Sequence, residues 1–184
     1  MKNRKHKIEI IFSYTGTAFS KFLKLMTRSK YVHISICLDG NPNEIYSFGR
    51  KNPRHMLPAG FVKEDLKYIS ELYKKAICLV YEKEIDEKQF NNLKNCINEY
   101  IKEQDKYQYD ILGLTFMVIG KPYQRRYHRV CSQFVGMVVQ KAQIYDFEGK
   151  HYSLIKPNDF YNMPDKERIY QGNLREYFEL IKGK

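Results

Sequence analysis

An apolar stripe at helical spacing follows Cys131 and constrains the fold of this chain more than any other feature. The stripe recurs three, four, seven, eight and eleven positions after the cysteine, at Phe134, Val135, Val138, Val139 and Ala142. This period predicts an amphipathic helix that begins near Cys131 and packs one face on a core. Free N–H groups at a helix start carry partial positive charge and favour a thiolate there. Cys131 is therefore a candidate nucleophile, and a buried structural cysteine is the competing interpretation.

A candidate base for this thiol lies on a predicted strand at residues 31–38. Large apolar side chains alternate there with small or polar ones, and the second set is His33, Ser35 and Cys37. Because Ser35 and Cys37 are small, we expect the cysteine helix to approach this face, with His33 over its start. A neutral imidazole can take the thiol proton and later return it to a leaving group. A solvent-exposed histidine on an amphipathic strand is the competing interpretation.

A residue that orients His33 is expected on the following strand, predicted at residues 44–48 after a turn-rich segment. Residues of equal parity share a face across such a hairpin, so Ser47 is expected on the side of His33 and Tyr46 on the other side. Ser47 is therefore the candidate orienter. Glu44, Tyr46 or no orienter at all remain open, because a hydroxyl cannot offset the charge of an imidazolium as a carboxylate does.

The predicted elements indicate an α+β fold, formed by one domain over residues 1–184. Strands and helices alternate without a regular βαβ rhythm. Asp86 with Gln89 forms a capping box for a helix up to about residue 104, and Asp110 is placed to cap a second helix. Residues 49–60 are expected to form an exposed loop. Tyr14 follows the predicted first strand and is a candidate for lining a cleft.

The formal net charge of +11 favours attraction to an anionic membrane surface or to nucleic acid. The charges are spread along the chain, and no recognised nucleic-acid motif is present, so we expect no specific nucleic-acid partner. Cys37, Cys78 and Cys96 fit core positions and show no zinc or disulfide spacing. The apolar run at residues 111–119 is too short to span a bilayer. We therefore expect a cytoplasmic protein without a metal or organic cofactor.

Three segments together resemble the circularly permuted papain-like proteins of the NlpC superfamily, including the YiiX-like branch and the relatives of lecithin–retinol acyltransferase. Residues 30–36 resemble the histidine strand of that group, residues 130–135 its cysteine helix start, and residues 156–160 a C-terminal segment of the YiiX-like branch. The resemblance covers the chain from Ile10 to about Phe160. It implies an antiparallel sheet or partial barrel packed on the cysteine helix, with the histidine strand ahead of the helix in the chain.

The resemblance also implies a function, namely that of a thiol-dependent peptidase, amidase or acyltransferase. Cys131 and His33 would act as a dyad on an amide or ester bond and form an acyl-enzyme. Peptides, acyl-peptides or lipids are the implied substrates. A catalytically inactive module that binds a lipid or peptide in its cleft is the second hypothesis, and a nucleic-acid-binding protein is a third.

Overall fold

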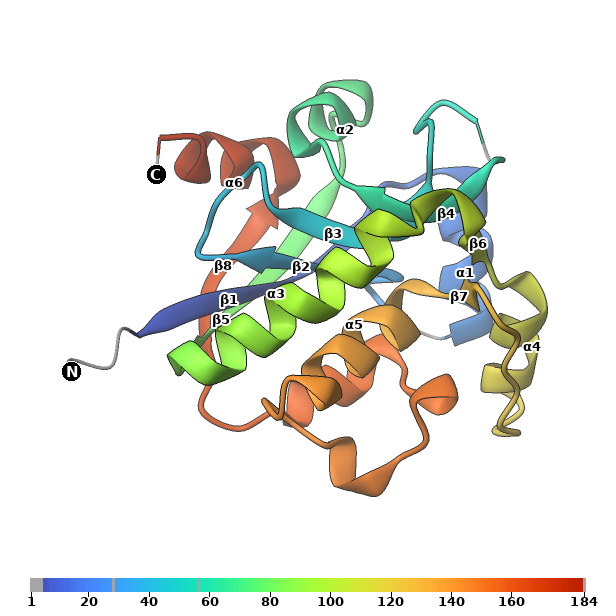
Figure 1. The fold of residues 1–184 in the computed structure, drawn as a ribbon. Helices are drawn as coiled ribbons and strands as arrows, with labels where there is room; N and C mark the ends of the chain where they lie inside the picture. The colour runs from blue at the N-terminus through green and yellow to red at the C-terminus, as the bar shows by residue number, and fades with distance from the viewer. Residues whose placement is uncertain (1–4, 28, 56, 184) are drawn as a thin grey trace.

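The structure is a computed structural model of the 184-residue chain, and it describes residues 5–27, 29–55 and 57–183 (Figure 1). Eight strands are formed, at β1 His6–Tyr14, β2 His33–Leu38, β3 Ile45–Arg50, β4 Ala59–Lys63, β5 Ile77–Ile85, β6 Gln108–Tyr109, β7 His128–Arg129 and β8 Glu167–Asn173. The α-helices are α1 Ala18–Thr27, α2 Leu66–Leu72, α3 Glu87–Lys102, α4 Ile111–Val118, α5 Cys131–Lys141 and α6 Leu174–Ile181. Short 3₁₀ turns lie at Gln104–Lys106, Phe147–Gly149, Tyr152–Leu154 and Pro157–Asn162.

Six of these strands form an antiparallel sheet in the order β4-β3-β2-β1-β5-β8, and β6 and β7 form a separate parallel pair. β1 is central and pairs with β2 on one side and β5 on the other. Its residues from Ile8 to Ser13 are all buried, with side chains on both faces. Such a continuous buried run fits a strand that is covered on both faces by other elements. The chain therefore has the predicted α+β class.

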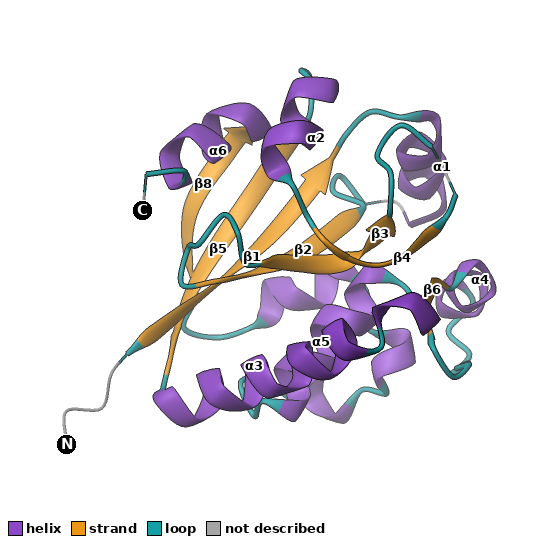
Figure 2. Cartoon of the chain, turned by 45° about the horizontal axis from the view of Figure 1, so that its top comes forward, coloured by secondary structure: helices purple, strands orange, loops and turns teal. Residues whose placement is uncertain are grey.

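Helices cover both faces of the sheet, as Figure 2 shows. On one face, α3 and α5 pack with the segments after α5 on a large apolar cluster that includes Ile34 and Ile36 of β2. On the other face, α2 and α6 pack on a smaller cluster that includes Cys37 and Cys78. A third cluster joins α1 to α4 at one end of the sheet.

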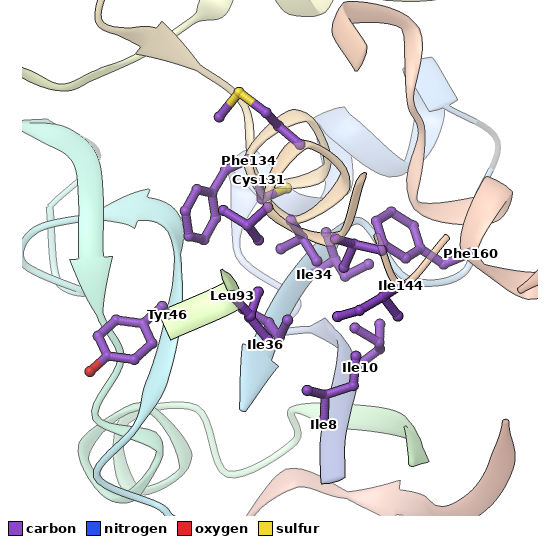
Figure 3. Packing of buried hydrophobic residues seen from close by; sticks show 14 of the residues in the cluster. Ile8, Ile10, Ile34, Ile36, Tyr46, Leu93, Cys131, Phe134, Ile144 and Phe160 are labelled. Atoms are coloured by element: carbon purple, nitrogen blue, oxygen red, sulfur yellow. The ribbon is translucent and has the colours of Figure 1, made fainter. Parts of the chain in front are cut away.

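The predicted position of the cysteine helix on the sheet is wrong. Figure 3 shows Cys131 and Phe134 of α5 beside Ile34, on the large apolar face of β2 rather than on the face of Ser35 and Cys37. The larger aliphatic side chains bury more apolar surface against α5, and this burial is the dominant favourable term in packing. α6 instead takes the face of Cys37 and fills it with Tyr177 and other residues.

Local signals in the sequence placed several helix starts correctly. Asp86 accepts from the N–H of Gln89 at 2.8 Å, and the Gln89 side chain accepts from the N–H of Asp86 at 3.1 Å, so the capping box is formed. Asp110 caps α4 by accepting from the N–H of Gly113 at 2.9 Å. The expected loop at residues 49–60 is shorter than predicted, because β3 extends to Arg50 and β4 begins at Ala59.

The end of the chain adds a strand and a helix for which the sequence shows no clear local signal. β8 extends the sheet beside β5, and Asn173 then caps α6 by accepting from the N–H of Arg175 at 2.8 Å. The described ranges of the chain contain no helix with the length and apolar character needed to cross a membrane.

Candidate active site

Cys131 is the first residue of α5, and the first turn of this helix is held firmly in place. The Gln133 side chain accepts from the N–H of Val130 at 3.1 Å and donates to the carbonyl of Ser153 at 2.9 Å. The Ser132 hydroxyl donates to the carbonyl of Ile155 at 2.6 Å. The thiol is therefore presented at a helix start whose orientation is fixed by the segment at residues 153–155. Cys131 itself is buried, with 4% of its surface exposed.

His33 is the first residue of β2, and its ring lies between a carboxylate and the thiol. Its Nε2 atom is 2.5 Å from Oε1 of Glu64, the residue that follows β4. The other carboxylate oxygen of Glu64 accepts from the Ser35 hydroxyl at 2.7 Å. Cys131 raises the pKa of His33 through hydrogen-bonding and charge contributions, so the sulfur lies close to the ring. The three side chains therefore form the series Glu64–His33–Cys131.

The electrostatics of this series favour a protonated imidazole. Burial lowers the pKa of His33, but the charge of Glu64 and the hydrogen bonds with Cys131 and Glu64 outweigh burial and raise the pKa to about 10. Burial raises the pKa of Glu64, and the charge of His33 together with hydrogen bonds from His33 and Ser35 lowers it below its usual value. The raised pKa of His33 and the lowered pKa of Glu64 both favour the charged form of the pair. At neutral pH the pair is an imidazolium held by a carboxylate, beside a cysteine sulfur.

Tyr109 is a second neighbour of the thiol. It ends β6, where it is opposite Arg129 of β7, two residues before Cys131. Burial, followed by the charge of Cys131 and a side-chain hydrogen bond with it, raises the pKa of Tyr109 well above its usual value. Its hydroxyl therefore stays protonated and serves as a hydrogen-bond donor at the site. The adjacent Asp110 is fixed by an ion pair with Arg125 at 2.7 Å, which anchors this end of β6.

A cleft of about 410 Å³ borders the site. His33, Glu64 and Tyr109 line it, whereas Cys131 is not among the described residues that do so. His33 and Tyr109, whose pKa values Cys131 raises, therefore lie between the cleft and the thiol. Most of the remaining wall is apolar, and it includes Leu23, Val32, Phe48, Val62, Leu66 and Ile111. Arg50 and Lys51 add positive charge to the wall.

Ser47 does not orient His33, and this part of the prediction is corrected. Its parity is as expected, because Ile36 pairs with Tyr46 and Cys37 with Ile45, which places Ser47 on the face of Ser35. Its hydroxyl, however, donates to the carbonyl of Ile34 at 2.6 Å and so joins β3 to β2. The carboxylate of Glu64 occupies the orienting position instead.

Glu44 and Tyr46, which lie near Ser47 in the chain, contact residues away from His33. The Glu44 carboxylate is 3.8 Å from Nζ of Lys94 on α3. Tyr46 stacks on Phe61 with ring centroids 6.1 Å apart, within the large apolar cluster. Both side chains therefore have structural partners in place of the imidazole.

Tyr14 does not line the cleft, and the expectation from the sequence is corrected here as well. Tyr14 is half-buried and packs against the apolar clusters on both sides of it. Nζ of Lys24 lies 5.0 Å above its ring. Tyr14 is not among the described lining residues, and Tyr109 provides the aromatic hydroxyl at the cleft.

Two of the residues at this site, Glu64 and Tyr109, are not indicated by the sequence patterns. The stretch at residues 45–63 contains no acidic residue, and Glu64 and Asp65 follow it directly. This isolation of the two acids is a weak signal that one of them has a specific role. Tyr109 precedes the helix cap at Asp110, and nothing in its local pattern indicates a contact with Cys131. Both residues reach the site through strand pairings between distant segments.

The remaining cysteines occupy packed positions. Cys37 and Cys78 are buried, and Cys96 is partly buried on α3. Within the described ranges, no group of three or more His, Cys, Asp and Glu side chains is placed to hold a metal ion.

Comparisons with protein-family models, with curated proteins and with solved structures found no match to this chain. The case for a function therefore depends on the geometry of the site.

Proposed function

We propose that this protein is a cysteine hydrolase or acyltransferase that acts on an amide or ester bond. The observation that carries this proposal is the series Glu64–His33–Cys131, in which a buried carboxylate holds an imidazolium beside a cysteine sulfur at a helix start. A nucleophile next to a base that is itself oriented by a third group is the usual signature of nucleophilic catalysis. A structural cysteine has no need of this arrangement.

The reaction begins from a thiolate–imidazolium pair, in which His33 holds the proton that Cys131 has given up. The thiolate attacks the substrate carbonyl and forms a tetrahedral intermediate. His33 donates its proton to the leaving amine or alcohol, and the acyl group remains on the sulfur. Water, or another acceptor, then attacks the thioester while His33 takes its proton. Collapse of the second intermediate releases the acid or acyl product and restores the Cys131 thiolate. Glu64 stabilises the imidazolium and fixes the ring, in the role that a triad carboxylate has.

Two hydrogen-bond donors are available to the oxyanion of each tetrahedral intermediate. The N–H of Cys131 belongs to the first turn of α5, where backbone N–H groups lack helical partners. The Tyr109 hydroxyl approaches the same sulfur from β6. Donors fixed in advance at a site with little water stabilise a developing negative charge strongly.

The architecture that fits this chemistry is the permuted papain-like fold. Its support is the order of the elements, since the histidine strand β2 precedes the cysteine helix α5 and the two pack together in an α+β fold. Substrates of the proposed enzyme are peptides, acyl-peptides or lipids. The apolar wall of the cleft fits an acyl chain or apolar side chains, and Arg50 and Lys51 fit an anionic group.

The test is acylation of the intact protein by an aryl ester probe, followed by mass spectrometry to locate the acyl group. We expect a thioester on Cys131, together with a burst of aryl alcohol equal to the enzyme concentration. Cys131→Ser should remove the burst, His33→Ala should slow it strongly, and the control Cys96→Ser should leave it unchanged. Acylation of Cys96 in preference to Cys131 would contradict the proposal.

The burial of Cys131 favours a second candidate function, a module that binds a lipid or peptide in the cleft without catalysis. In that case the probe would leave Cys131 unmodified, and Cys131→Ser would bind ligands as tightly as the original protein.

A further inference from the structure

Exposed apolar side chains gather at one end of the molecule, around the cleft. Among the described residues, nine large hydrophobic side chains are exposed, and six of them belong to α1, to the β3–β4 loop or to α4 with its end. These six are Phe22, Leu25, Leu57, Ile111, Leu112 and Ile119, and each is at least half exposed. Isolated exposed hydrophobics are ordinary, but a group of this kind marks an interaction surface.

The three segments that carry these side chains are neighbours in space. Leu23 of α1 packs with Leu114 and Met117 of α4 in one buried cluster. Leu57 and Ile111 both line the cleft, so the β3–β4 loop and α4 each contribute to its wall. Figures 1 and 2 agree that α1 and α4 lie at the same end of the sheet, away from α6. Two of the six exposed side chains, Leu57 and Ile111, are therefore part of the cleft beside the proposed active site.

Three acid-free ranges of the chain, which include the segments of this end, carry more positive charge than the net charge of the whole chain. Residues 10–38, 45–63 and 111–145 contain 13 Lys and Arg and no Asp or Glu. The rest of the chain, with 19 basic and 21 acidic residues, is close to neutral. Exposed cations in α1, in the β3–β4 loop and after α4 include Lys21, Lys24, Lys51, Arg54, Lys121 and Arg126. The exposed hydrophobic side chains and the exposed cations thus belong to the same three segments, namely α1, the β3–β4 loop and α4 with the residues after it.

We propose that this end of the molecule is a docking face for an anionic lipid bilayer, formed by the six exposed hydrophobics and the six exposed cations named above. Aliphatic and aromatic side chains enter the boundary between headgroups and acyl chains, while lysines and arginines remain among the anionic headgroups. The three segments that carry the face contain no Asp or Glu, which such a surface would repel. The exposed side chains that mark it are mainly Leu and Ile, which offer no stacking platform for nucleic-acid bases.

The position of the face adds a consequence for substrate. Since Leu57 and Ile111 belong both to the docking face and to the cleft wall, a docked molecule would meet its substrate at the membrane surface. This step rests on the proposed function, whereas the docking itself does not.

The experiment is co-sedimentation of the full chain with vesicles of phosphatidylcholine alone and of phosphatidylcholine with phosphatidylserine at 3:1. We expect binding to the anionic vesicles to be at least tenfold tighter, and to weaken as NaCl is raised from 0.05 to 0.5 M, since salt screens exposed charges. Leu25→Glu with Ile119→Glu should weaken binding at least tenfold. The matched control is Leu180→Glu, a similarly exposed leucine on α6, which should bind as the original protein does. Lys21→Glu with Lys121→Glu should also weaken binding, and Lys88→Glu on α3 is its control.

Several results would overturn the docking face. One is equal affinity for neutral and anionic vesicles, and another is equal loss in Leu180→Glu and in the Leu25 and Ile119 variant. A third is binding of single-stranded RNA, but not of vesicles, that depends on Lys21 and Lys121. Sedimentation velocity that shows a dimer broken by Leu25→Glu, without vesicle binding, would assign the face to a second copy instead. Cys131→Ser should bind vesicles normally, so a failure of the proposed chemistry and a failure of docking are separate outcomes.

Discussion

Glu64 lies 2.5 Å from His33 across the sheet, although 31 residues separate them in the chain. The pairing of β4 with β3 and of β3 with β2 places the backbone of Glu64 level with Cys37, and its side chain reaches back along the same face to Ser35 and His33. Ser35 holds the second oxygen of the carboxylate. The carboxylate therefore orients the His33 ring and favours its protonated form. Substitutions of Glu64 and of its partners should accordingly change activity the most.

Replacing Glu64 by Gln should reduce turnover far more than replacing Ser47 by Ala. The amide keeps the shape of Glu64 but removes the charge that stabilises the imidazolium, and general acid–base catalysis contributes on the order of 10²–10⁴ in rate. We expect a loss of at least about 10² in kcat/KM, measured with the aryl ester probe. Ser47→Ala should cost only about 1 kcal/mol of stability, since it removes one neutral hydrogen bond to Ile34. A Ser47→Ala enzyme as slow as Glu64→Gln would refute this assignment.

The stability of the protein should depend on the charge of His33 at alkaline pH. The fold raises the pKa of this group from 6.5 to about 10, so folding favours its protonated form. Its contribution is complete below about pH 6.5 and is lost as the pH rises through about 10. The free energy of unfolding, measured by urea denaturation at pH 7, 8, 9 and 10, should therefore fall more steeply in the original protein than in His33→Gln. Lysines and tyrosines titrate in both proteins, so their contributions to the free energy of unfolding cancel in the difference between the two slopes. Parallel slopes would mean that the imidazole is not held in its charged form.

Cys131 should react with limiting iodoacetamide before the other three thiols in the folded protein at pH 6. Burial raises the pKa of Cys78 to about 12 and also raises the pKa of Cys96, so both are poor nucleophiles. A free thiol is under about one per cent ionised at this pH, whereas Cys131 has an imidazolium partner. His33→Ala should slow the labelling of Cys131. Cys96 is more exposed than the other cysteines and could compete for the reagent, so Cys96→Ser is the control. Peptide mapping identifies the alkylated cysteine. Modification of all four cysteines only after unfolding would assign Cys131 a structural role.

Tyr109→Phe should separate oxyanion stabilisation from thiolate formation. Removal of one oxyanion donor typically costs about 10²–10³ in rate, so acylation by the ester probe should slow by at least about tenfold even for an auxiliary donor. Alkylation by iodoacetamide forms no oxyanion and should change by less than a few fold. Tyr107→Phe is the control, since its ring packs on Tyr100 with centroids 4.5 Å apart. Equal slowing of both reactions would show that Tyr109 acts only by positioning the sulfur.

Local sequence signals predicted those parts of the fold that depend on near neighbours. Helical periodicity placed the start of α5 at Cys131, and the side chains of Asp86 and Asp110 marked two helix starts. Strict alternation predicted β2, with His33 as its first residue in the structure. Each of these signals depends on hydrogen bonds or on side-chain directions within a few residues, which a sequence displays directly.

The tertiary structure decided what depends on distant pairings. α5 packs on the face of β2 that carries Ile34 and Ile36, because these side chains offer the larger apolar area. The other face of β2 is closed by α6. The orienter of His33 depended on the register of β4, a short strand that the sequence pattern did not predict. Charges that are scattered along the chain became one face only because α1, the β3–β4 loop and α4 assemble at one end. The sequence by itself determined the cysteine, the histidine and their elements. Their partners were fixed by the folded chain, because a contact between residues dozens of positions apart exists only once the strands between them are paired.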